Sequence, residues 1–361
     1  MKKIAIFSDN LNVGGIQKSL INLLNNYKNK NCEIDLYLFE KSNFFEQQIP
    51  KNIKVIYLPK PMFLSKFLYF NIFKILFTSK YKKCIKKYDI AIDFDSYQNH
   101  TALCAILTGA TSKIMWIHND VSEKLKGEPK YKVLHHFFKR KYYYFNKFVG
   151  VSSGVIEPFQ RVNKNIKGNF FIIPNFIDTK EIIEKSKLSL NFQVDSSKYN
   201  LVSVGRLCYQ KGFDILIYKI NELIKYRKDV HLYIIGDGPE RNILNNIVKK
   251  NKLSDFVTFL GNQKNPFNYM SQMDGFILMS RYEGQGMVIL EAKTLGLELF
   301  IPKHLEKYVE DVDGYDNIIE PLRETVKKNK KINTLDNYNK AILESIDKLF
   351  SLWLENLKWL K

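Results

Sequence analysis

The sequence has few cysteines, and their arrangement excludes two classes of protein. Cys32, Cys84, Cys104 and Cys208 are widely separated and form no Cys-x-x-Cys pair. Scattered thiols of this kind are typical of reduced, cytosolic proteins and not of disulfide frameworks or zinc modules. We therefore expect a cytoplasmic protein without a bound metal.

Long hydrophobic runs are also lacking. The apolar run at residues 4–7 is too short for the core of a signal peptide. The longest stretch, Phe67 to Phe77, is interrupted by Asn71 and Lys74, whereas a helix that crosses a bilayer needs roughly 20 apolar residues. The sequence therefore predicts neither secretion nor a membrane span.

Negative charge is scarce in the first half of the chain. Residues 1–176 hold 28 Lys and Arg against 12 Asp and Glu, whereas residues 177–361 hold 28 against 25. A general compositional bias would affect both halves alike, so we expect the first half to face an anionic partner. A phospholipid surface, a lipid-linked diphosphate and nucleic acid all fit this charge. Recognisable nucleic-acid-binding motifs are absent, which disfavours the last of them.

What the sequence does contain is an alternation of short apolar runs with helical patterns. This alternation, over a length of 361 residues, predicts two α/β domains with doubly wound sheets. The runs expected to form strands are residues 4–7, 34–39, 53–58, 89–94, 114–117 and 147–151, and then 200–204, 230–235, 256–260, 275–278 and 297–301.

These runs divide the chain into residues 1–176, residues 177–340 and a final segment, residues 341–361. Ligands of doubly wound folds bind beyond the carboxyl ends of the strands, so two such domains should face a central cleft. The final segment carries apolar residues at helical spacing. We expect it to form an amphipathic helix that packs across both domains.

Two cations follow the first predicted strand of the second domain. Arg206 and Lys211 lie in the loop between that strand and a helix expected to begin near Phe213. An Arg fork, a Lys ammonium and the free amide groups of a helix N-terminus are suited to a diphosphate. They could also stabilise the charge that develops when a nucleotide diphosphate leaves.

A second loop combines glycines with carboxylates. Gly284 and Gly286 allow close backbone approach, so that the amides of residues 286–288 can point at an anion. Glu283 precedes this turn and Glu291 lies on the following helix. Carboxylates accept strong hydrogen bonds from hydroxyl groups, which favours a polyol ligand here.

These elements resemble, in order and spacing, the retaining glycosyltransferases of family four, which have the GT-B fold of two Rossmann-like domains. In the first domain, the loop 14–17 and residues 116–120 are similar to the acceptor-side elements of that family. In the second domain the resemblance is carried by Gly205-Arg206-Leu207 with Lys211-Gly212, by residues 235–241, by Phe259-Leu260-Gly261 and by Glu283-x7-Glu291.

The resemblance implies a role for each matching residue. The donor would be a nucleotide diphosphate sugar, with UDP as the expected nucleotide, and no cofactor is implied. The second domain would bind most of it, and His118 of the first domain would lie at the reacting centre. The implied contacts are the diphosphate for Arg206, Lys211 and Gly15; the ribose for Glu291; the sugar for Glu283, Gly284, Gly286, Met287 and Val288; and the base for Gly261 with its neighbours.

The resemblance also implies a mechanism. The anomeric configuration would be retained by a front-face route, with Arg206, Lys211, Glu283 and His118 as catalytic residues and without a protein nucleophile or a metal. The Asp-x-Asp pairs at residues 93–95 and 311–313 are therefore interpreted as chance. After Gly296 the family's glycine pair is absent, so the resemblance does not indicate which sugar is transferred.

Residues 66–83 mix aromatic and basic side chains, and so do residues 137–148. Each segment fits either an interfacial helix on the inner face of the plasma membrane or a helix of the domain core. With the membrane alternative, the acceptor would be a polyprenyl-diphosphate-linked saccharide of surface polysaccharide assembly. Two other functions remain open, a GT-B nucleotide-sugar epimerase and a non-enzymatic basic protein that binds lipid or nucleic acid.

Overall fold

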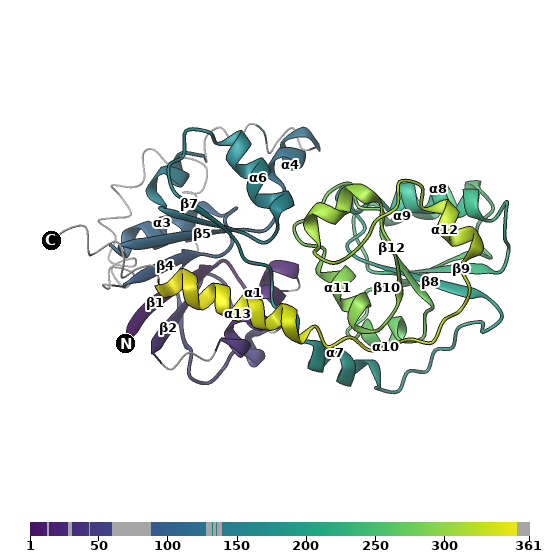
Figure 1. The fold of residues 1–361 in the computed structure, drawn as a ribbon, viewed down its shortest axis with the longest axis horizontal. Coiled ribbons are helices and arrows are strands. Elements are labelled where there is room, and N and C mark those ends of the chain that lie inside the picture. The colour runs from purple at the N-terminus through teal and green to yellow at the C-terminus, as the bar shows by residue number, and fades with distance from the viewer. Residues whose placement is uncertain are drawn as a thin grey trace. The chain divides into compact units, whose positions relative to one another are not determined.

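The computed structural model describes residues 1–12, 14–27, 31–42, 44–59, 88–127, 132, 135 and 139–351. The chain divides into two compact units. Unit 1 contains residues 1–176 and the chain from residue 337 onward, and unit 2 contains residues 177–336. Each unit is a parallel sheet with helices packed on its faces (Figure 1).

The described part of unit 1 has a seven-stranded parallel sheet in the order β3-β2-β1-β4-β5-β6-β7. The order reverses between β1 and β4, and the carboxyl ends of strands at such a point are the usual ligand site of a doubly wound fold. The strands are β1 (Lys2–Ser8), β2 (Cys32–Leu38), β3 (Lys54–Tyr57), β4 (Ile90–Asp93), β5 (Ser112–Ile117), β6 (Lys147–Gly150) and β7 (Asn169–Ile172).

Helices connect these strands. In α1 residues 19–24 are all buried, while residues 15–18 of its first turn are not. Six consecutive buried residues exceed one turn, so the middle of α1 is covered on all sides and its N-terminal turn is accessible. The described helices of unit 1 are α1 (Gly15–Asn26), α3 (Asn99–Leu107), α4 (Val121–Gly127), α6 (Ser153–Val162) and α13 (Asp336–Ser351), with the short helices η1 (Glu46–Gln48) and η3 (Lys139–Tyr144).

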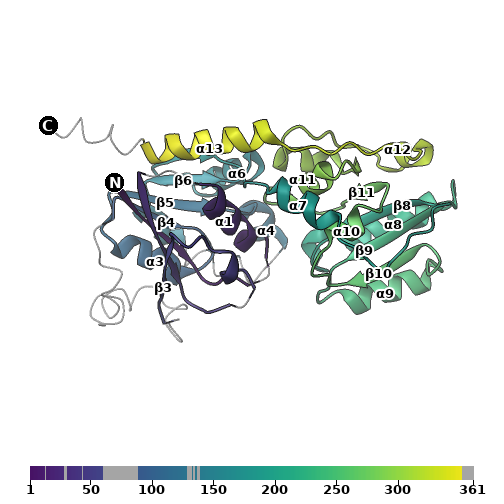
Figure 2. The ribbon, with the colours of Figure 1, turned by 90° about the horizontal axis from the view of Figure 1, so that it is seen from below.

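Helix α13 packs against the body of unit 1 (Figure 2). The Phe350 ring meets the Tyr27 ring edge-on, with centroids 5.4 Å apart, and the Tyr27 hydroxyl donates to Asp347 at 3.1 Å. The Lys2 ammonium donates to the Phe350 carbonyl at 2.7 Å. Lysines at the last carbonyls of a helix satisfy acceptors and suit the helix dipole. Residues 352–361 of the predicted final helix lie outside the described residues.

Unit 2 has a five-stranded parallel sheet in the order β10-β9-β8-β11-β12. Its strands are β8 (Tyr199–Val204), β9 (Val230–Ile235), β10 (Val257–Gly261), β11 (Gly275–Ile277) and β12 (Glu298–Phe300). Its helices are α7 (Thr179–Ser186), α8 (Phe213–Leu223), α9 (Arg241–Lys250), α10 (Phe267–Met270), α11 (Met287–Thr294) and α12 (Ile319–Glu324), with η4 (Tyr209–Lys211) and η5 (Lys303–Tyr308). Each apolar run that predicted a strand forms one, and the prediction of two Rossmann-like α/β domains is confirmed.

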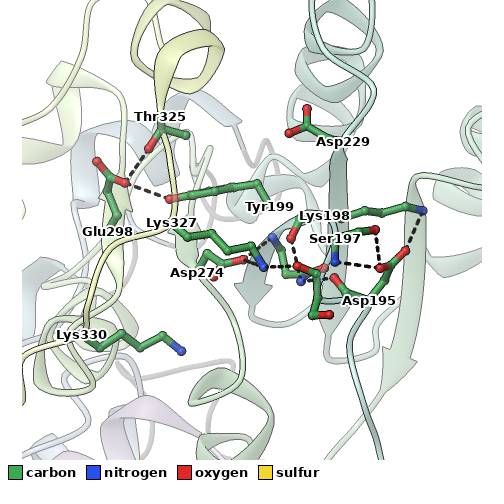
Figure 3. Close-up of polar contacts among 12 residues, drawn as sticks. Asp195, Ser197, Lys198, Tyr199, Asp229, Asp274, Glu298, Thr325, Lys327 and Lys330 are labelled. Carbon is green, nitrogen blue, oxygen red and sulfur yellow. Dashed lines mark hydrogen bonds and ion pairs between the residues drawn. The ribbon is translucent and has the colours of Figure 1, made fainter.

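Polar side chains form a network at the amino ends of the strands of this second sheet (Figure 3). Glu298, the first residue of β12, accepts hydrogen bonds from Tyr199 at 2.9 Å, Thr325 at 2.6 Å and Lys328 at 2.7 Å. Burial opposes the charge of this carboxylate, but the three donors together lower the pKa of Glu298. Lys327 likewise lies 3.4 Å from Asp274. These contacts hold the exposed lysine run 327–331, which precedes α13 in the sequence, against the sheet of unit 2.

Candidate active site

Loops from neighbouring strands of unit 2 meet backbone to backbone at the carboxyl edge of the sheet. Gly212, which precedes α8, has φ 62°, and a Cβ there would lie 2.0 Å from the Met279 carbonyl oxygen. Gly236 follows β9 with φ 132°, and its Cβ would lie 2.0 Å from the Gly205 carbonyl oxygen. Only glycine permits both the backbone angle and the approach. The loops after β8, β9 and β11 are therefore packed as one layer.

Arg281 ties two of these loops together. Its guanidinium forms a two-pronged ion pair with Asp214 at 2.9 and 2.6 Å and donates to the Tyr209 carbonyl at 2.7 Å. It also stacks 4.0 Å from the centre of the Tyr209 ring. The Gln210 amide adds a hydrogen bond to the Tyr282 carbonyl at 3.1 Å. These contacts fix the loop that carries Lys211 beside the loop that carries Glu283.

Lys211 and Glu283, which are 72 residues apart in the sequence, form an ion pair. The ammonium lies 2.7 Å from Oε1 and 3.0 Å from Oε2 of the carboxylate. The Ser280 hydroxyl donates to the same Oε1 at 2.5 Å. The Glu283 side chain is 5% exposed and the Lys211 side chain 19%. The buried Glu283 carboxylate thus holds the Lys211 ammonium, which remains partly accessible to solvent.

Arg206 lies two residues beyond the end of β8 and is exposed. Within the described ranges, no ion pair or hydrogen bond engages its guanidinium. It therefore differs from Arg281 and Lys211 in having its charge available for a ligand. An available guanidinium and a paired ammonium on one loop are suited to bind an anion with more than one phosphate.

Gly286 turns the chain into α11. Its φ of 64° lies in the left-handed region, and a Cβ would come 2.8 Å from a methyl group of Ile289. No side chain caps this helix, so the first-turn amides around Met287 and Val288 remain for another acceptor. Gly284 precedes this turn, and Glu291, a half-buried residue of α11 with contacts of its own, follows it.

Gly261 ends β10 at the same edge of the sheet. It has φ 70°, and its carbonyl accepts a hydrogen bond from the Gly236 amide at 2.8 Å. A Cβ at this position would meet no atom within 4 Å. The candidate base-binding residue therefore lies beside open space. Unit 2 thus gathers Arg206, Lys211, Gly261, Glu283, Gly284, Gly286, Met287, Val288 and Glu291 along one edge.

Gly15 and His118 belong to unit 1. Gly15 is the exposed first residue of α1, and a Cβ there would meet nothing within 4 Å. His118 follows β5, and its Nε2 lies 2.8 Å from the Phe94 carbonyl oxygen. Burial lowers the pKa of His118 to about 3. The ring is therefore neutral at physiological pH, with Nε2 as the donor and Nδ1 as an acceptor.

The sequence did not predict the buried polar cluster at the switch point of the first sheet, and Asp95, one of its members, was interpreted only as part of a chance Asp-x-Asp pair. His100 Nε2 lies 2.8 Å from Asp9 Oδ1, and Asp95 accepts hydrogen bonds from Ser8 at 3.2 Å and from the Asp9 amide. Burial raises the pKa of Asp95 to about 7. The signal was present, since Asp9 directly follows β1 and Asp95 lies two residues after the end of β4. Within the described ranges, no group of three His, Cys, Asp or Glu side chains could hold a metal ion.

The structure describes only one of the two segments that mix aromatic and basic residues, and that one in part, from residue 139 onward. Residues 66–83 lie outside the described residues. In η3, Lys141 and Tyr142 are buried, and burial lowers the pKa of Lys141 to about 8. Lys139, Arg140, Tyr143 and Tyr144 of the same short helix are exposed. No helix in the described part of the chain has the length and apolar character of a membrane span.

Residues 198–316 match the family model described as Glycosyl transferases group 1. The O-antigen biosynthesis glycosyltransferase WclY of Escherichia coli is 32% identical over 142 residues, which are 38% of this chain and 39% of that protein. N-acetylgalactosamine-N,N'-diacetylbacillosaminyl-diphospho-undecaprenol 4-alpha-N-acetylgalactosaminyltransferase of Campylobacter jejuni is 24% identical over 97% of both chains. Five of the curated relatives are matched over only 35% to 59% of their own length.

A solved structure extends the likeness to both units. HepE of Anabaena, crystallised with UDP and glucose, is 18% identical and has a TM-score of 0.68 over 99% of this chain and 100% of that one. At this identity the likeness concerns the fold. The family match lies on the unit that carries the Lys211–Glu283 pair. Residues 198–316 are thus similar to the group 1 glycosyltransferases, and the chain has the GT-B fold.

Proposed function

We propose that the protein transfers a sugar from a nucleotide diphosphate donor to a saccharide acceptor. The observation that carries this proposal is the carboxyl edge of unit 2, where the free Arg206 guanidinium, the Lys211–Glu283 pair and the uncapped start of α11 lie on adjoining loops. Cations and amides suit the diphosphate, and carboxylates suit sugar hydroxyls. The group 1 match over residues 198–316 covers these loops.

The proposed reaction exchanges one bond at the anomeric carbon. The bond from this carbon to the diphosphate oxygen breaks, and a bond to an acceptor oxygen forms on the same face, so that configuration is retained. The proton of the acceptor hydroxyl passes to the leaving phosphate oxygen. No protein nucleophile and no metal take part. Arg206 and Lys211 stabilise the negative charge of the leaving diphosphate.

The other residues bind and orient the two substrates. Glu291 accepts from the ribose, Gly261 lies against the base, and Glu283 with residues 284–288 holds the transferred sugar. Gly15 of unit 1 approaches the diphosphate. Neutral His118 accepts from a hydroxyl of the sugar or the acceptor through Nδ1, because Nε2 is engaged by the Phe94 carbonyl.

The donor nucleotide is proposed to be UDP, and the acceptor a polyprenyl-diphosphate-linked saccharide in surface polysaccharide biosynthesis. HepE was crystallised with UDP and glucose, and the Campylobacter jejuni relative is named for a diphospho-undecaprenol acceptor. The E. coli relative is named for O-antigen biosynthesis. The positive charge of residues 1–176 favours an anionic, diphosphate-bearing acceptor on the same grounds.

We further propose that the protein works in the cytoplasm, at the inner face of the plasma membrane. The exposed Lys139, Arg140, Tyr143 and Tyr144 of η3 combine cations with interfacial aromatic rings. Sedimentation with vesicles of anionic or neutral lipid tests this. The protein should pellet with anionic vesicles only, and less after Lys139→Glu with Arg140→Glu. Equal binding of the variant would contradict the assignment to η3.

A panel of nucleotide sugars tests the central proposal. One donor should raise the melting temperature as its concentration exceeds its dissociation constant. That donor should then transfer its sugar to a lipid-linked acceptor. Arg206→Ala and Glu291→Ala should each reduce transfer by about 100-fold without unfolding the protein. Conversion of free donor without acceptor would instead indicate an epimerase, and salt-sensitive adhesion that survives both substitutions would indicate a binding protein.

A further inference from the structure

Glu283 is the best-anchored polar group of the candidate site. Its carboxylate accepts three hydrogen bonds, two from Lys211 and one from Ser280, of about four that it can accept. Ser280 is itself fully buried, and its carbonyl accepts from His304 Nε2 at 2.9 Å. Buried Ser280 therefore still holds the Glu283 carboxylate when the Lys211 ammonium moves away.

Lys211 is the partner that can move. Its side chain is 19% exposed, against 5% for Glu283, and it reaches the carboxylate through a flexible four-carbon stem. Its backbone is fixed by the adjoining Gly212 turn, whereas its ammonium carries three donors that can be redistributed among acceptors. A small rotation of the stem is enough to redirect this charge.

We infer that Glu283 competes with the nucleoside diphosphate for Lys211 and thereby weakens binding of the product. This inference rests on the proposed function. The ammonium pairs with Glu283, as in the structure, and turns toward a diphosphate that binds beside it. Once the sugar has left, the fixed carboxylate reclaims the ammonium and repels the remaining nucleotide.

The arrangement serves turnover because product release limits the rate of many enzymes. Two uncompensated cations on one loop would hold a nucleoside diphosphate tightly whether or not a sugar were attached. Glu283 offsets one of them, while Arg206 has no partner in the described part of the chain. A donor with its sugar regains the lost attraction, because sugar hydroxyls can donate to the carboxylate oxygen that Lys211 vacates. The site therefore distinguishes donor from product.

Titration of UDP and of inorganic pyrophosphate into the full-length protein tests this inference. Glu283→Gln keeps the shape of the side chain and removes its charge, so it should tighten the binding of both ligands about fivefold, less at high salt. The matched control is Glu222→Gln on α8, which removes one charge from a surface pair with Lys219 at 2.8 Å. The control should bind UDP as the wild type does.

Binding of the nucleotide sugar identified by the panel should respond differently from binding of UDP. Glu283→Gln should not bind this donor more tightly, since the hydrogen bond to the sugar is weakened. Equal or weaker UDP binding by a folded Glu283→Gln variant overturns the inference. Should that variant not fold, Glu283→Asp, which withdraws the charge by one methylene group, must bind UDP more tightly than the wild type. A wild type that binds neither pyrophosphate nor any nucleoside diphosphate overturns the proposed function instead.

Discussion

At the scale of single residues, unit 2 buries an ionised side chain in an ion pair, whereas unit 1 buries a histidine in its neutral form. Glu283 is ionically paired with Lys211, whereas His118 of unit 1 is buried against the Phe94 carbonyl, and burial lowers its pKa to about 3. A buried histidine that stays neutral makes the folded chain bind fewer protons than the unfolded chain in mild acid. The consequence is a dependence of stability on pH.

We predict that unit 1 loses about 2 kcal/mol of stability through His118 between pH 7 and pH 5. The unfolded histidine takes up a proton below pH 6.5, while the folded one does not until pH approaches 3. His118→Asn should therefore be less destabilising at pH 5 than at pH 7. Urea unfolding followed by tryptophan fluorescence measures this, because Trp116, Trp353 and Trp359 all fall outside residues 177–336. Parallel pH profiles of the two proteins would refute the prediction.

Gly236 gives a second prediction at this scale. Gly236→Ala should destabilise unit 2 by more than about 2 kcal/mol, because φ is 132° and the new Cβ would lie 2.0 Å from the Gly205 carbonyl oxygen. The control is Gly15→Ala, where a Cβ meets no atom within 4 Å. Thermal unfolding should show a much lower melting temperature for the first variant and almost no change for the second.

At the scale of elements, the site depends on the bracing of two loops. The loop that contains η4 and the loop that precedes α11 are joined by Arg281, which bonds Asp214 and the Tyr209 carbonyl. Lys211 and Glu283 meet because of this bracing, although neither touches Arg281 in the contacts described above. Arg281 is therefore a positioning residue whose loss should affect chemistry more than stability.

Arg281→Ala should lower transfer activity about tenfold while costing roughly 1 kcal/mol of stability, since the ion pair is partly exposed. The matched control is Arg227→Ala, which removes a similar two-pronged pair with Asp229, at 2.8 and 2.7 Å, before β9 at the opposite edge of the sheet. The control should lose stability and keep activity. Equal activity losses would show that the bracing has no special role.

The elements were more predictable than the contacts between them. Strands of parallel sheets are buried on both faces, so they appear in the sequence as nearly continuous apolar runs, as β9 does apart from His231. The Lys211–Glu283 pair joins residues 72 positions apart, and its geometry depends on glycines whose backbone angles no sequence pattern states. The Asp9–His100 contact was missed for the same reason. An amphipathic pattern predicted α13 but not the unit on which it packs.

At the scale of the whole molecule, unit 2 is one continuous segment, whereas unit 1 is built from both ends of the chain. The core of unit 2 is formed entirely by its own residues, with apolar side chains of α8 and α9 packed on β8 and β9. Among the described residues of 1–176, none contributes a side chain to that core. The second unit thus has the anatomy of an autonomous domain.

Residues 177–336, expressed alone, should fold cooperatively and bind UDP, though more weakly than the full chain because the contact proposed for Gly15 is missing. Circular dichroism on heating and titration with UDP measure the two properties. A folded segment without affinity for UDP would mean that unit 1 supplies essential donor contacts. A segment that does not fold would contradict the autonomy of unit 2.

The return of the chain to unit 1 has a consequence for biosynthesis. During translation, the strands of unit 1 leave the ribosome first, but helix α13, whose Ile342, Ile346, Leu349 and Phe350 are buried in the finished protein, emerges only after all of unit 2. The apolar surface that α13 covers must stay exposed while some 160 further residues are made. Nascent chains stalled before residue 336 should therefore recruit chaperones that bind apolar surface, and finished chains that have left the ribosome should not.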